Sequence, residues 1–102
     1  MQFQLVLQFN GDSLGDYDSM VALEDELIQE LADTADVDGH DVGAGETNIF
    51  IVTSEPESAF DRAKAVLDRS NLLGAVTVAY RPMAGQNYTV LWPAHRQDFA
   101  VA

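Results

Sequence analysis

The chain has no cysteine, and no Lys or Arg precedes Arg62. Without cysteine, a disulfide, a thiolate nucleophile and a cysteine-ligated zinc site are all excluded. No apolar run approaches the roughly 20 residues that span a bilayer. The first ten residues, Met1 to Asn10, lack the basic start of a signal peptide and alternate as a strand does. We therefore expect a cytoplasmic protein.

Negative charge dominates the N-terminal part of the chain. The first 61 residues hold 15 Asp and Glu, and the whole chain has 17 acidic and 5 basic side chains, which gives a net charge of -12. Such a surface repels nucleic acid and anionic membranes, and it attracts basic proteins and cations. Nucleic-acid binding is therefore excluded, and the partner class that we expect is a basic protein.

The remaining composition is that of a globular protein. The chain has 102 residues, of which 47% are hydrophobic and 22% charged, so the acidity does not indicate disorder. A chain of this length forms one domain with a core of moderate size. We expect that domain to span residues 1–93 and to be followed by a flexible tail, 94–102.

The spacing of apolar residues predicts two helices and five strands. Alternation predicts strands near 2–9, 76–81 and 88–92, and residues 48–53 predict a central strand that is apolar on both faces. A weak edge strand and a turn are predicted within 35–46. One helix is expected from Asp16 or Asp18 to about Ala32, and a second from a capping box at Ser54 to Glu57. The buried stripe of the first helix is expected to hold Met20, Leu23, Leu27 and Leu31, widened by Val21 and Ile28.

This order of elements predicts an α+β, two-layer, ferredoxin-like (split β-α-β) sheet with two helices on one face and an extra C-terminal strand. The side chains of the first strand that face the helices should be Phe3, Leu5, Leu7 and Phe9. Those facing away should be Gln4, Val6 and Gln8, beside either the pair Phe50 and Val52 or the pair Ile49 and Ile51. The uncovered face is either solvated or the interface of a homodimer.

The segment Asp36 to Glu46 is the stretch that most resembles a site. Its candidate ligands for a divalent cation are Asp36, Asp38, Asp41 and Glu46, although their spacing does not match an EF-hand. Its candidates for catalysis are His40 as a general base, with Asp38, Asp41 and Glu46. Alternation along a strand would, however, send His40 and Asp41 to opposite faces. The same Asp and Gly residues also suit a turn without any chemistry.

The run VDGHDVGAGETNIFIVTSEP, from Val37 to Pro56, resembles a stretch found in small bacterial proteins of uncharacterised function. The resemblance covers about twenty residues and implies no activity.

The charge distribution favours a non-catalytic module that binds a basic partner, for example an inhibitor or immunity protein against a nuclease-like toxin. The residues expected to contact that partner are Glu24, Asp25, Glu30 and Asp33 on and after the first helix. The basic residues of the second helix, Arg62, Lys64 and Arg69, are expected to lie near these acids. Two alternatives stay open: a small divalent-cation-dependent enzyme that uses Asp36 to Glu46, and a dimeric module that binds a small ligand. No organic cofactor is expected.

Overall fold

The computed structural model describes residues 1–10, 17–43, 45–94, 99 and 101. Its strands are β1 (Phe3–Asn10), β2 (Ala35–Gly43), β3 (Glu46–Thr53), β4 (Val76–Pro82) and β5 (Thr89–Trp92). Its helices are α1 (Tyr17–Leu31) and α2 (Pro56–Arg69), with a short 3-10 helix, η1 (Leu73–Ala75), before β4. The predicted α+β class is confirmed. Asp16, one of the two predicted starts of the first helix, lies outside the described residues.

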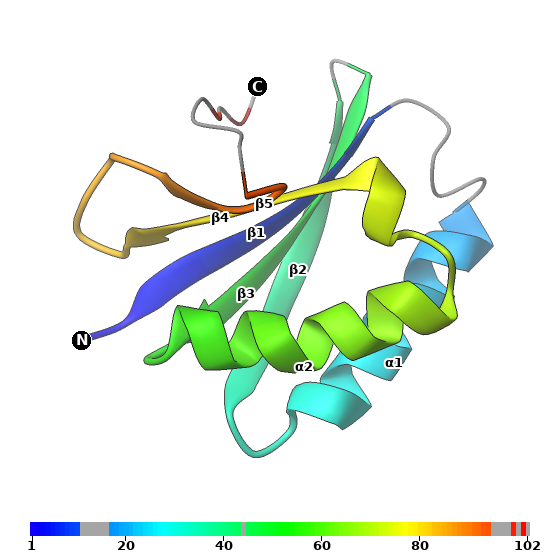
Figure 1. The fold of residues 1–102 in the computed structure, drawn as a ribbon, viewed down its shortest axis with the longest axis horizontal. Helices are drawn as coiled ribbons and strands as arrows, with labels where there is room; N and C mark the ends of the chain where they lie inside the picture. The colour runs from blue at the N-terminus through cyan, green and yellow to red at the C-terminus, as the bar shows by residue number, and fades with distance from the viewer. Residues whose placement is uncertain (11–16, 44, 95–98, 100, 102) are drawn as a thin grey trace.

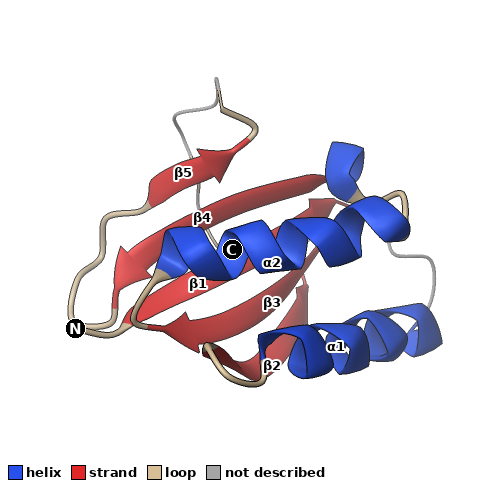
Figure 2. Ribbon diagram, turned by 60° about the horizontal axis from the view of Figure 1, so that its bottom comes forward, coloured by secondary structure: helices blue, strands red, loops and turns tan. Residues whose placement is uncertain are grey.

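The five strands form one open sheet in the order β2-β3-β1-β4-β5, and every neighbouring pair is antiparallel (Figure 1). The first strand in the sequence therefore lies in the middle of the sheet. The two helices lie side by side on one face, with α1 near β2, and β5 extends beyond α2 at the other edge (Figure 2). The sheet and the helices make two layers.

The core lies between the sheet and the helices. Leu5, Leu7 and Phe9 of β1 are fully buried there, as their period of two predicts. Ile49 and Ile51 of β3 join the same core, since they lie opposite Leu7 and Leu5. The structure thus decides between the two predicted arrangements: Phe50 and Val52 are on the face away from the helices.

Helix α1 buries a narrower stripe than the sequence predicts. Met20, Leu23, Leu27 and Leu31 are buried, as expected. The prediction for Ile28 is wrong, because its side chain is 50% exposed. Successive residues of a helix point about 100° apart, so the Ile28 side chain points well away from Leu27. Because α1 packs near the edge of the sheet, only the side of the helix that carries Leu27 is covered, and Ile28 lies outside it.

Helix α2 begins differently from the prediction. The N-cap residue is Glu55, Pro56 follows in the first turn, and the capping box from Ser54 is absent. Thr53 at the end of β3 takes over the local hydrogen bonding: its Oγ1 accepts from the Glu55 N–H at 3.0 Å and donates to the Thr34 carbonyl at 3.2 Å. The buried Thr53 hydroxyl therefore forms the hydrogen bonds at the turn from strand to helix, and the N-cap, Glu55, lies one residue after the predicted cap, Ser54.

Strand β2 is longer than the weak strand predicted within 35–46. It runs for nine residues along the edge of the sheet and pairs with β3 along its length except at Asp38. A bulge lies between Val37 and Gly39, and Gly39 has a φ of +145°, which other residues rarely adopt. The strongly apolar β3 provides the ladder that this Asp- and Gly-rich segment could not form by itself.

The sheet face away from the helices is partly enclosed within one chain. Val6 and Ala79 lie at its centre and are fully buried. Beside them the buried Gln8 side chain donates from Nε2 to Asn48 Oδ1 at 3.1 Å. Phe50 is half-buried. The surface that this face offers to a second copy is therefore smaller than a bare sheet would offer, and the homodimer stays a prediction.

Of the predicted tail 94–102, the structure describes Ala94, Phe99 and Val101. The Phe99 ring lies edge-on against the Tyr88 ring, with centroids 4.9 Å apart, so this residue packs onto the domain. In the described part of the chain no helix is both long enough and apolar enough to cross a membrane.

Candidate functional site

Exposed acidic side chains are carried by α1, by the residues just after it, and by the edge strand β2, against which α1 packs. Neither element carries a Lys or Arg. We call this edge of the molecule the anionic face, and its exposed acids are Asp18, Asp25, Glu26, Asp33, Asp36, Asp38 and Asp41. Asp36 and Asp41 point to the side of the sheet away from α1, since they lie opposite Val52 and Asn48. Because two elements that are neighbours in space carry charge of one sign, the segregation seen along the sequence persists in three dimensions.

The four residues predicted to contact a partner have different surroundings. Asp25 and Asp33 are exposed. The Glu24 side chain is 13% exposed and lies against His40. Glu30 Oε1 is 3.8 Å from Arg69 Nη1, in an ion pair open to solvent. Asp25 and Asp33 are therefore the two of the four whose carboxylates are fully presented to a partner.

Three side chains from α1 and β2 are in contact here: Glu24, His40 and Tyr17. His40 Nδ1 lies 3.1 Å and 3.2 Å from the two carboxylate oxygens of Glu24, and since a carboxylate only accepts, the ring nitrogen donates. The Tyr17 ring stands edge-on to the imidazole with centroids 6.0 Å apart. The carboxylate that contacts His40 is therefore Glu24 of α1, a residue that the sequence did not link to His40.

Strand alternation explains this pairing. His40 lies opposite Ile49, which faces the helices, whereas Asp41 lies opposite Asn48, which faces away. The two side chains therefore point to opposite faces, as alternation predicts. Among the described residues, the hydrogen bonds of the His40 ring are those of Nδ1 to Glu24, and catalysis by His40 stays a prediction. What the contact does in this structure is tie β2 to α1.

The candidate ligands for a divalent cation are spread along two strands. Asp36, Asp38 and Asp41 are exposed on β2, and Glu46 begins β3, where its Oε1 accepts from Gln8 Nε2 at 3.4 Å. Within the described residues no three His, Cys, Asp or Glu side chains are grouped closely enough to hold a metal ion. Cation binding by this segment stays a prediction.

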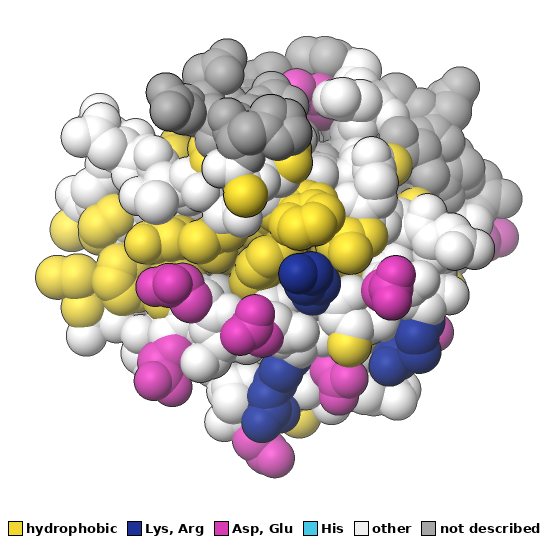
Figure 3. Space-filling view, viewed as in Figure 1, with side chains coloured by type: hydrophobic (Ala, Val, Ile, Leu, Met, Phe, Trp, Pro, Cys, Tyr) yellow, Lys and Arg dark blue, Asp and Glu magenta, His cyan; other side chains and the backbone are white. Residues whose placement is uncertain are grey.

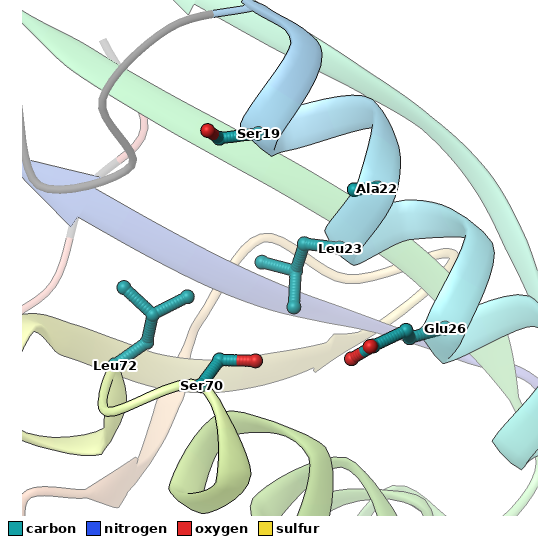
Figure 4. Close-up of a pocket in the computed structure, with 6 residues that line it drawn as sticks. All are labelled: Ser19, Ala22, Leu23, Glu26, Ser70 and Leu72. Atoms are coloured by element: carbon teal, nitrogen blue, oxygen red, sulfur yellow. The ribbon is translucent and has the colours of Figure 1, made fainter.

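A groove of about 310 Å³ lies between α1 and the end of α2, a feature that the sequence did not indicate. The side chains of Leu23 and Leu72 point into it from opposite sides, and Glu26 and Ser70 point into it beside them (Figure 4). Ser19 lines its outer end. An apolar floor next to one carboxylate suits a side chain that is aliphatic along its length and cationic at its tip, as Lys and Arg are.

The basic residues of α2 lie only partly where the sequence predicts. Arg69 reaches Glu30, as expected, and Arg62 Nη1 donates to the Glu30 carbonyl at 3.5 Å. Lys64 is on another side of the helix, with its Nζ 4.7 Å from the centre of the Trp92 ring. Arg62 and Arg69 thus place positive charge beside Glu30, on the side of α1 that faces α2. The other acids of α1 have no Lys or Arg beside them among the described residues.

No protein-family model, no curated protein and no solved structure matches this chain. Its function has to be argued from the surfaces described above.

Proposed function

We propose that the chain is a non-catalytic binding module whose anionic face engages a basic protein partner. The observation that carries the proposal is the placement of exposed acids from α1 and β2 on adjoining elements that lack Lys and Arg. A surface of one sign raises the rate at which an oppositely charged partner arrives and disfavours partners of like charge. An inhibitor or immunity protein for a nuclease-like partner is one form of this function, because nucleases are basic where they bind nucleic acid.

We further propose that the domain is ferredoxin-like. In support, β1 and β2 are connected through α1 and separated in the sheet by β3, and β3 and β4 are connected through α2 and separated by β1. Strands that lie on either side of a shared antiparallel neighbour run parallel to each other, so each helix makes a β-α-β crossover. Two interleaved crossovers are the split β-α-β plan, to which β5 is added beside β4. Since that fold hosts many functions, it adds no argument about the partner.

The groove between α1 and α2 gives the partner a place to anchor. Its carboxylate, Glu26, is also part of the anionic face. A partner Lys or Arg would lay its aliphatic stem on Leu23 and Leu72 and bring its charge to Glu26. A partly enclosed contact of this kind slows dissociation, whereas the exposed carboxylates around it act mainly on the association rate.

The experiment measures the association rate with immobilised poly-L-lysine as the basic probe. The double variant Asp25→Lys/Asp33→Lys reverses two fully presented charges of the anionic face. We expect its association rate at low salt to fall about tenfold relative to the unmodified chain, and the two rates to converge as salt rises. The matched control, Asp61→Lys/Asp68→Lys, makes the same change in net charge on α2.

If the control variant loses as much as the α1 variant, net charge alone accounts for the attraction and the anionic face has no special part in it. If neither variant changes the association rate, the proposal of electrostatic engagement by this protein is wrong.

A further inference from the structure

The helices leave one part of the sheet uncovered on their own side. Helix α1 contacts β2 and α2 contacts β1, and β5 extends past the helical layer (Figure 2), whereas Val76 and Val78 of β4 are still buried in the core. Four half-buried apolar side chains face outward there beside the core, and we call them the apolar band: Phe3, Tyr80, Leu91 and Trp92. Figure 3 shows hydrophobic side chains running as a band across this face of the molecule, bordered by acidic side chains and by Lys or Arg.

The band is built from fixed aromatic contacts. Phe3 and Tyr80 meet edge to face, with centroids 5.6 Å apart and ring planes at 85°. Trp92 donates from Nε1 to the Leu73 carbonyl at 2.8 Å and lies 6.3 Å from the Phe60 ring. Because these rings are held in place before any partner arrives, binding to them would order few side chains, which favours affinity.

One end of the band opens into a groove of about 360 Å³ at the start of α2. Phe3, Tyr80 and Pro56 line its apolar part, and Glu55 and Glu57 stand beside them, both exposed. The N-terminus of a helix carries the equivalent of about +0.5 charge. Two carboxylates outweigh it, so this end of the band is negative.

We propose that the apolar band and the groove at the start of α2 are a docking surface for an amphipathic, basic segment of a partner protein. The apolar side chains of the segment lie along the band, and a Lys or Arg enters the groove, where aromatic rings and carboxylates both favour a cation. Lys64 lies over Trp92 at the other end of the band and repels a second cation there. The charges therefore also fix the direction of the segment.

This surface is separate from the anionic face, and charge complementarity selects its occupant. Its acids are Glu55, just before α2, and Glu57 of α2, whereas those of the anionic face belong to α1, the residues just after it, and β2. An anionic segment would meet these two carboxylates without compensation, and a second copy of this chain would bring its own acids to the same place.

Trp92 is the chain's single tryptophan and belongs to the band, so its fluorescence reports on this surface. The probe is a short tryptophan-free peptide of leucine and lysine with leucine at helical spacing. We expect the peptide to cause a saturable change in Trp92 emission. Phe3→Ala should bind the peptide about tenfold more weakly, because the variant removes a side chain that anchors it. Glu55→Gln/Glu57→Gln should weaken binding of the peptide as well. If Phe3→Ala does not fold, this second variant tests the proposal in its place.

Two control variants make equivalent changes elsewhere: Ile28→Ala removes an exposed apolar side chain from α1, and Asp61→Asn/Asp68→Asn removes two exposed acids from α2. Both should bind the peptide as the unmodified chain does in the Trp92 assay. A peptide with glutamate in place of lysine should leave the emission unchanged.

Three results would overturn the inference. Binding detected by calorimetry without a change in Trp92 emission would place the peptide on another surface, and this outcome leaves the proposed function of the anionic face standing. Equal binding of the glutamate peptide would remove the selection for basic segments. An emission change that depends on the concentration of the protein alone would assign the band to a second copy.

Discussion

His40 Nδ1 of the edge strand β2 lies 3.1 Å from Glu24 Oε1 of α1. The Glu24 side chain is 13% exposed and the His40 side chain 30%, so water screens the contact less than it does a fully exposed ion pair. The pair joins the two elements that form the anionic face, and its contribution to stability can be measured.

A double-mutant cycle should show coupling between these two residues. The cycle combines Glu24→Ala and His40→Ala, and urea unfolding gives the free energy of each variant. We expect a coupling energy of about 0.5–1 kcal/mol. The comparison cycle is Glu30→Ala with Arg69→Ala, a pair that is 3.8 Å apart and more exposed. Its coupling should be smaller. Coupling near zero for both pairs would show that the His40 contact adds nothing to stability.

Neighbouring residues of α1 should respond very differently to truncation. Leu27 is fully buried in the core, whereas Ile28 is 50% exposed. We expect Leu27→Ala to lower the free energy of unfolding by about 2–5 kcal/mol, because the variant buries less apolar surface and leaves a cavity in the core. Ile28→Ala should change it by less than about 0.5 kcal/mol. Similar losses in the two variants would mean that α1 is rotated relative to the sheet.

The acids of β2 should keep the edge of the sheet from pairing with other chains. Replacing them in Asp36→Thr/Asp38→Thr/Asp41→Thr leaves an uncharged edge with residues that favour strands. We expect this variant to elute in gel filtration as a larger species than the unmodified chain. The charged control, Asp36→Lys/Asp38→Lys/Asp41→Lys, should elute as the unmodified chain does. A triple Thr variant that elutes unchanged at every concentration tested would show that charge does not protect this edge.

Stability should rise with sodium chloride. The net charge is -12, and between roughly 0.01 M and 1 M salt the Debye length falls from about 30 Å to about 3 Å. Screening worth about 1 kcal/mol would raise the melting temperature by roughly 4–8 °C. Asp25→Asn/Asp33→Asn should reduce this rise more than Glu57→Gln/Asp61→Asn does, because α2 also carries three basic side chains. A melting temperature that is independent of salt would contradict self-repulsion.

Periodicity was enough to predict the body of the fold. The alternation of β1 and the helical spacing of α1 and α2 each identify an element and its buried face, and these local signals agree with the tertiary structure. Where two local signals competed, the prediction failed: both Thr53 and Ser54 offer a hydroxyl at the start of α2, and the buried Thr53 forms the bonds. The length of β2 could not be predicted either, because its pairing depends on β3.

The candidate site was harder to predict than the fold. Glu24 and His40 are 16 residues apart in the sequence, and only the packing of α1 on β2 brings them together. The apolar band depends on a different kind of information, namely which strands the helices leave uncovered. Charge segregation, by contrast, could be read directly, because it follows from which elements carry acids and which carry bases.

The central position of β1 has a consequence for how the chain folds. Both neighbours of β1 in the sheet, β3 and β4, are synthesised after it, and Phe3 pairs with Thr53 on one side and Pro82 on the other. Large loops must close before the middle of the sheet exists, and such non-local pairing slows folding relative to a helical bundle of equal size. In a nascent chain that ends before β4, one edge of β1 would have no strand to pair with. Ribosome-bound chains that include β4 should therefore resist protease much better than chains that end before it.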